Sequence, residues 1–257
     1  MMLGSIIGDI IGSTYEFNNA GRYDFDPFPP EADFTDDTVL TVAVADAILG
    51  KRPYGEVIHK YASRYPNRGY GLRFIGWIHM ADPQPYNSFG NGSAMRAGPI
   101  GWAFGTIEET ISEARKSAEC THNHPEGIKG AEAVAAAIFM ARMGADKSEI
   151  KEFIEKRFHY NLSRTLEEIK PGYTFNETCQ KTVPEAFSCF LESSDFEDAI
   201  RKAIWLGGDS DTLACITGGI EEAYYEEMKA DWVEKANALL PKEFGVVIAR
   251  FKAAFAK

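Results

Sequence analysis

The stretch Phe34-Thr35-Asp36-Asp37-Thr38 places two adjacent carboxylates and two hydroxyls directly before the apolar run Val39 to Leu49. A second stretch, Gly207-Gly208-Asp209-Ser210-Asp211-Thr212, repeats this combination before the apolar run Leu213 to Tyr225. Hydroxyl and acidic residues in front of an apolar run are typical of a helix N-terminus. The two stretches therefore predict two apolar helices, each beginning in an acidic cluster.

Helical periodicity extends outward from these two stretches over most of the chain. Helix starts are indicated by a hydroxyl or aspartate followed three residues later by glutamate: Thr106 with Glu109, Asp146 with Glu149, and Ser194 with Glu197. Helices are expected in an apolar N-terminal segment and over 38–50, 106–119, 127–143, 178–191, 195–206, 213–227 and 242–256. The clearest strand candidate runs from Phe158 to Tyr173. Short connections favour one compact all-α domain over residues 1–257.

The overall composition argues against some classes of binding partner. The chain of 257 residues has a net charge of −11 and no basic patch, which argues against nucleic acid and against an anionic membrane surface. No apolar stretch approaches the length of a membrane span.

The four cysteines lack C-x-x-C spacing, so they predict neither a zinc site nor a disulfide framework, and we expect a cytoplasmic setting. The oligomeric state stays open.

The two acidic clusters together predict a metal site. Clustered carboxylates repel one another, and Mg²⁺, Mn²⁺ and Ca²⁺ prefer all-oxygen ligands. Helix capping is the simpler interpretation of either cluster alone, but it does not explain why both combine paired carboxylates with a hydroxyl. Asp209-Ser210-Asp211-Thr212 also matches the D-x-D motif of haloacid-dehalogenase-type phosphatases, but that motif follows a buried strand and this one follows the helical segment 199–206.

Three further motifs supply polar groups. The turn Asn87 to Arg96 is rich in Ser, Asn and Gly, so its backbone N–H groups could cradle an anion, although a structural turn is the simpler interpretation. Thr121-His122-Asn123-His124-Pro125 either ends a helix or lines a pocket. Asp9 lies on an apolar helix and must be paired or capping a neighbour, while Glu16 lies near the end of that helix and is free to reach a pocket.

The order of these motifs resembles the ADP-ribosylglycohydrolase family. The resemblance rests on Gly8-Asp9 with Gly12 and Glu16, the Thr35-Asp36-Asp37 cluster, Gly90 to Arg96, Thr121-His122 and the Gly207 to Thr212 cluster, and it ends near residue 226. It implies an all-α bundle around two divalent cations, Mg²⁺ or Mn²⁺. The implied metal ligands are Thr35, Asp36, Asp37, Asp209, Asp211 and Thr212.

The resemblance also implies a substrate and a reaction. The ligand would be ADP-ribose or an ADP-ribosylated acceptor, held by Ser88, Gly90, Asn91, Gly92, Ser93, Met95 and His122. The reaction would be hydrolysis of the glycosidic bond to an acceptor such as arginine or serine, with Glu16, Asp36 or Asp37 as the catalytic acid or base. Two alternatives remain open: a two-metal phosphohydrolase that cuts the diphosphate, and a catalytically silent ADP-ribose-binding protein.

Overall fold

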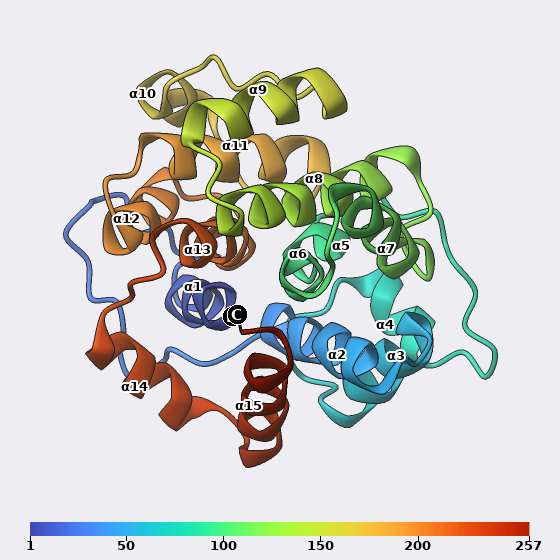
Figure 1. The fold of residues 1–257 in the computed structure, drawn as a ribbon. Helices are drawn as coiled ribbons and strands as arrows, with labels where there is room; N and C mark the ends of the chain where they lie inside the picture. Colours follow the sequence, from blue (N-terminus) through green and yellow to red (C-terminus); the bar gives the residue numbers. More distant parts are fainter. Residues whose placement is uncertain (257) are drawn as a thin grey trace.

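The computed structural model describes residues 1–256, and it is built of helices (Figure 1). In the described part of the chain the only β-pairing is an isolated bridge between Gly90 and Thr178. The elements are α1 (Leu3–Ser13), α2 (Asp36–Gly50), α3 (Tyr54–Arg64), α4 (Leu72–Ile78), α5 (Gly92–Met95), α6 (Gly98–Ala103), α7 (Ile107–Glu119), α8 (Pro125–Arg142), α9 (Lys147–Phe158), α10 (Leu166–Ile169), the 3-10 turn η1 (Lys170–Gly172), α11 (Cys179–Glu192), α12 (Phe196–Leu206), α13 (Ser210–Tyr225), α14 (Ala230–Leu239) and α15 (Lys242–Phe255).

The all-α prediction is confirmed, but the strand expected between Phe158 and Tyr173 is wrong. Thr165 and Glu168 form a reciprocal capping box there, which starts the short helix α10, and the η1 turn follows. The capping residues therefore determine the structure of this segment, and its weak strand pattern does not. The helix start expected at Ser194 is displaced by one residue, since the Asp195 side chain accepts the hydrogen bond from the Asp198 backbone. Helices α3, α4 and α14 were not anticipated.

Helices α1 and α13 lie side by side at the centre of the molecule (Figure 1). Glycines four residues apart along α1 permit this contact: a Cβ on Gly4 would lie 2.1 Å from the Gly218 carbonyl oxygen, and one on Gly8 would lie 2.1 Å from that of Ala214. A Cβ on Gly12 would lie 2.3 Å from the Cα of Asp211. The glycines therefore bring the backbone of α1 directly against α13 and against its acidic N-terminus.

Asp9 joins α1 to the start of α2. Its buried carboxylate accepts hydrogen bonds from the Thr35 backbone (3.0 Å), the Thr35 hydroxyl (2.6 Å) and the Thr38 backbone (3.1 Å). The expectation that Asp9 caps a neighbouring segment is confirmed. Because α1 contacts both α2 and α13, the two acidic helix starts are brought to one side of the molecule.

The remaining helices cover this centre. Helices α8, α11 and α12 pack on α13, and α15 packs on α2. The ring of Phe244 in α15 lies 5.6 Å from that of Phe34, two residues before α2. Within residues 1–256, no helix has the length and apolar character that crossing a membrane requires. The four cysteines form no disulfide.

Candidate active site

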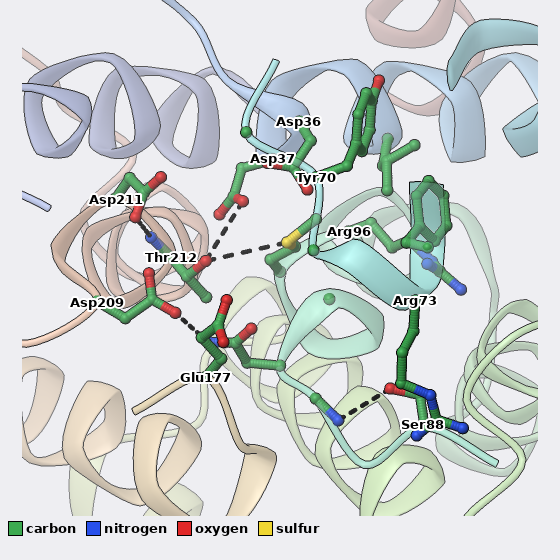
Figure 2. A pocket seen from close by; sticks show the side chains of 18 of the residues that line it. Asp36, Asp37, Tyr70, Arg73, Ser88, Arg96, Glu177, Asp209, Asp211 and Thr212 are labelled. Atoms are coloured by element: carbon green, nitrogen blue, oxygen red, sulfur yellow. Dashed lines mark hydrogen bonds between the residues drawn. The ribbon is translucent and has the colours of Figure 1, made fainter. Parts of the chain in front are cut away.

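A pocket of about 540 Å³ opens where the N-termini of α2 and α13 face each other. Figure 2 shows its aspartates on one side and Arg73 and Arg96 on the other. Its walls come from segments that are distant in sequence and lie within residues 16–17, 36–40, 69–74, 86–96, 122, 175–177 and 209–212. The pocket thus has an acidic end and a basic, aromatic end.

The acidic end joins the two clusters that the sequence singles out. The Thr212 hydroxyl at the start of α13 donates to Asp37 at the start of α2 over 3.3 Å. Asn91 donates to Asp209 over 2.6 Å and is itself fixed by Thr182. The structure therefore brings α2, α13 and the Gly90–Gly92 loop together at one point.

Glu16 extends this acidic end. One carboxylate oxygen each from Glu16, Asp209 and Asp211 lies within 4.8 Å of the others, which is a separation that a shared cation could span. Glu16 belongs to the loop after α1, and Asn19 of that loop exchanges two hydrogen bonds with the Gly208 backbone, at 2.8 and 3.2 Å. Both Gly207 and Gly208 have positive φ, so this turn requires glycine.

Burial and mutual repulsion dominate the electrostatics of this end. Desolvation raises the pKa of Asp36, Asp37 and Asp211 well above the ordinary value, and neighbouring carboxylates add to the effect. Desolvation likewise raises the pKa of Asp209 to about 6 and, with the nearby Asp211 and Glu177, raises the pKa of Glu16 to about 8. The protein alone does not neutralise these carboxylates.

The donor set fits hard divalent cations. Asp37 is only 1% exposed, and its buried oxygen Oδ2 has no hydrogen-bond partner among the described residues. Such an orphaned carboxylate oxygen is expected where a cation supplies the missing charge. Asp36, Asp37, Asp209, Asp211 and Thr212 line the pocket and present oxygens alone. The Thr35 side chain instead donates to Asp9 and accepts from the Asp37 backbone, and Thr35 does not line the pocket.

His122 lies at the opposite end, facing the glycine loop. A Cβ on Gly92 would lie 3.3 Å from its Nε2, so the glycine leaves the ring room. Its Nδ1 lies 2.7 Å from the Thr121 hydroxyl, which also accepts from Arg96 over 2.9 Å. Burial lowers the pKa of His122 well below the ordinary value, and the charges of Arg96 and Arg73 lower it further. The imidazole is therefore neutral at physiological pH.

Arginine and aromatic side chains surround His122. The Arg73 guanidinium lies 5.0 Å from the centre of the Tyr86 ring and donates to the Tyr86 carbonyl. The Tyr86 ring lies 6.1 Å from that of His122. Arg96 is fully buried, and two of its nitrogens, Nε and Nη1, have no partner within residues 1–256. This end therefore offers positive charge and ring faces together.

Most of the substrate-binding residues named from the sequence lie on this pocket, namely Ser88, Gly90, Asn91, Gly92, Met95 and His122. Ser93 does not, because its buried hydroxyl donates to the Gly127 carbonyl over 2.7 Å. The next histidine, His124, caps the N-terminus of α8. Sequence reasoning missed Arg73, which lies in the short helix α4, and Tyr86 and Glu177, which lie in irregular loops; no motif marks any of them.

Comparisons with known proteins show which sequences this chain is similar to. A family model described as ADP-ribosylglycohydrolase matches residues 1–253, so the similarity extends beyond residue 226, where the motif-based resemblance ended. ADP-ribosylhydrolase ARH3 of Homo sapiens is 26% identical over 318 residues, with 92% of this chain and 88% of that protein covered. ADP-ribosylarginine hydrolase Tri1 of Pseudomonas putida (strain GB-1) is 26% identical over 271 residues, covering 91% of this chain and 72% of its own.

The fold is also shared with a solved structure. A chain of an "ADP-ribosylglycohydrolase-related protein complex" superposes with a TM-score of 0.74 at 25% sequence identity. The superposition covers 98% of this chain and 96% of the other. Sequence and fold comparisons therefore point to the same group of proteins.

Proposed function

Because this chain belongs to the ADP-ribosylglycohydrolase family, we propose that it hydrolyses the glycosidic bond between ADP-ribose and an acceptor. The observation that carries the proposal is the polarity of the pocket. One end holds carboxylates suited to cations and the other holds arginines, a neutral histidine and aromatic rings. ADP-ribose has the same polarity, with a free ribose at one end and a diphosphate and purine towards the other.

The nucleotide portion is proposed to occupy the basic end. Arg73 and Arg96 supply charge for the diphosphate, and the Gly90–Gly92 backbone approaches it without side chains. In the tautomer in which Thr121 donates to Nδ1 of His122, the Nε2–H group is free to donate to a phosphate oxygen. Tyr86 offers a ring face for the purine.

The acidic end is proposed to hold two divalent cations, Mg²⁺ or Mn²⁺, between the starts of α2 and α13. Asp36, Asp37, Asp209, Asp211 and Thr212 are the proposed ligands, and Thr35 would join them only through an oxygen already bonded to Asp9. When bound, such cations orient vicinal ribose hydroxyls and offset the charge of the carboxylates.

Glu16 is proposed as the general acid. The bond between the ribose C1″ and the acceptor breaks, a water hydroxyl joins C1″, and the leaving atom takes a proton. Burial and neighbouring carboxylates raise the pKa of Glu16 to about 8 in the metal-free protein, and burial is the largest cause, so its surroundings favour the protonated form that a general acid needs. One of the aspartates Asp36 and Asp37 would then orient the attacking water.

The test is product analysis by mass spectrometry. The protein is incubated with Mg²⁺ or Mn²⁺ and a panel of acceptors carrying ADP-ribose on arginine, on serine or on a small molecule. The proposal predicts intact ADP-ribose plus free acceptor in at least one reaction. AMP plus an acceptor that still carries ribose phosphate would identify a phosphohydrolase instead. ADP-ribose binding without turnover of any substrate would identify a silent binding protein.

A further inference from the structure

Two loops border the acidic end of the pocket, and each carries one glutamate and one phenylalanine. The loop after α1 contributes Glu16 and Phe17, and the loop before α11 contributes Phe175 and Glu177. Both phenylalanines are exposed, Phe17 to 83% and Phe175 to 43%, although they border a pocket. Large exposed apolar side chains beside a pocket commonly mark a contact with a ligand.

The phenylalanines act as one surface. The rings of Phe17 and Phe175 lie 5.7 Å apart with their planes tilted by 31°. We define this pair as the aromatic rim. Two neighbouring exposed rings offer an apolar surface on which a planar group that leaves the pocket can pack.

Both loops are anchored at the same turn. Asn19 of the first loop is hydrogen-bonded to the Gly208 backbone, as described above. Tyr173 of the second loop packs so closely on Gly208 that a Cβ there would lie 2.6 Å from its ring. The second loop is also held by the bond from the Asn91 backbone to the Glu177 carbonyl, at 2.8 Å. The aromatic rim is therefore fixed relative to Asp209 and Asp211.

Charge at this end has one sign. The Glu177 side chain is exposed, and within residues 1–256 no hydrogen bond or ion pair engages its carboxylate. The carboxylate of Glu177 lies close enough to Glu16 and Asp209 to raise the pKa of both. The pocket arginines, Arg73 and Arg96, lie at the far end (Figure 2). The charge of Glu177 would not attract a neutral acceptor such as a serine hydroxyl, whereas it would attract a cation.

We propose that the aromatic rim and Glu177 form a subsite for a planar cation, so that the acceptor is the guanidinium group of arginine. This inference rests on the proposed function and specifies its acceptor. A guanidinium stacks on aromatic faces through cation–π attraction and pairs with a carboxylate through its fork of N–H donors. In this arrangement Phe17 and Phe175 stack on the guanidinium and Glu177 accepts its hydrogen bonds, while Glu16 acts on the leaving nitrogen.

The test compares one peptide ADP-ribosylated either on arginine or on serine. Wild type is expected to have the higher kcat/KM on the arginine-linked peptide. The variants Phe175→Leu and Glu177→Gln are expected to raise KM for that peptide about 3- to 30-fold, the scale of a cation–π contact, with kcat within about twofold. Neither variant should change the affinity for free ADP-ribose, because both residues lie beyond the ribose.

Phe89→Leu is the matched control. Phe89 is 42% exposed, nearly the same as Phe175, but its ring packs on His124, 5.3 Å away, outside the pocket. The same substitution there should leave KM for both peptides unchanged. An equal effect of Phe89→Leu and Phe175→Leu would overturn the inference, as would a preference for the serine-linked peptide that Phe175→Leu does not alter.

A binding measurement separates this inference from the proposed function. Glu16→Gln keeps the shape of the site and slows turnover, so calorimetry on this variant compares the two intact peptides. Tighter binding of the arginine-linked peptide, lost when Phe175→Leu is added, supports the subsite even if wild type cleaves neither peptide and the proposed hydrolysis fails. Equal binding of both peptides removes the subsite even if wild type cleaves both.

Discussion

Glu16 differs from the other acidic residues of the pocket in where it lies. The four aspartates occupy the first turns of helices or the residue just before them, whereas Glu16 belongs to a loop three residues beyond the end of α1. Its carboxyl is half-buried, and burial raises its pKa more than any single neighbouring charge does. A carboxyl whose pKa is raised in this way and that lies beside the proposed ribose site is suited to proton transfer.

Replacing Glu16 tests this role. Glu16→Gln removes the proton donor but keeps size and polarity, so kcat should fall by about 10²- to 10⁴-fold, the usual contribution of general acid–base help. Free ADP-ribose affinity should stay within a few fold. Single-turnover rates and calorimetry give the two quantities. Glu31→Gln is the control, because Glu31 belongs to the same connecting segment and does not line the pocket. Near-normal rates in Glu16→Gln would move the acid to Asp36 or Asp37.

The residues that sequence reasoning identified are those whose chemistry is local. Asp209 and Asp211 are marked by a glycine turn before an apolar run, and Asp9 by being acidic on an apolar helix. Arg73 and Tyr86 could not be identified this way, because they meet only when the segment after α4 folds back. The sequence likewise does not show that the Ser93 hydroxyl points away from the pocket, because its hydrogen-bond partner, the Gly127 carbonyl, lies far along the chain in α8.

At the scale of elements, the contact between α1 and α13 determines the site. The contact brings Gly12 against the backbone of Asp211, so the helix that holds Asp9 also fixes the second acidic cluster. Interiors are close-packed, and a methyl group inserted between two backbones cannot be accommodated by a rotamer change. The helix pair should therefore tolerate no side chain at its three glycines.

Gly8→Ala tests the helix pair. Its Cβ would lie 2.1 Å from the Ala214 carbonyl oxygen, so the helices must separate, and we expect a loss of roughly 1–3 kcal/mol or more in the free energy of unfolding. Gly76→Ala in α4 is the control, since a Cβ there meets nothing within 4 Å; it should stabilise by about 0.5–1 kcal/mol through helix propensity. Urea unfolding measures both. Equal effects at the two positions would contradict the close contact.

Helix boundaries were predictable where a cap is encoded locally. Asp146 and Glu149 form the expected capping box of α9, and Thr106 accepts the expected bond from the Glu109 backbone. Helix α4 has only seven residues, too few to show a clear period, and α14 lacks a side-chain cap. Such helices are stabilised mainly by tertiary packing, for which a sequence pattern gives weak signals.

At the scale of the whole molecule, the cation site proposed at the acidic end predicts that stability depends on divalent cations. We propose that residues 1–257 unfold as one domain, so that ligand binding at the site stabilises the whole. Mg²⁺ or Mn²⁺ at about 100 times its dissociation constant should add about 2.7 kcal/mol and raise Tm. The double variant Asp209→Ala/Asp211→Ala should abolish this shift and leave the metal-free protein no less stable than wild type. An unfolded double variant would make these carboxylates structural.

The same carboxylates predict how the metal-free protein responds to pH. The folded-state pKa of Asp9 and Asp209 is raised to about 6, above the unfolded value, so the folded state binds more protons between pH 4 and 6. The contribution of these groups to stability should therefore be fully present below pH 4 and decline as the pH rises through 6, with Glu16 extending the decline towards 8. Each pKa unit corresponds to roughly 1.4 kcal/mol. Denaturation at several pH values checks this, and saturating Mg²⁺ should flatten the slope.

The contact between α1 and α13 also bears on how the protein is made. The Gly4 amide donates to Glu222 over 2.9 Å across a separation of 218 residues, so opposite parts of the chain meet at its centre. A ribosome releases α1 first, and α1 must then wait for most of the polypeptide before its partner helix emerges. Contacts of such long range slow folding. The pocket therefore cannot form until α13 has been synthesised.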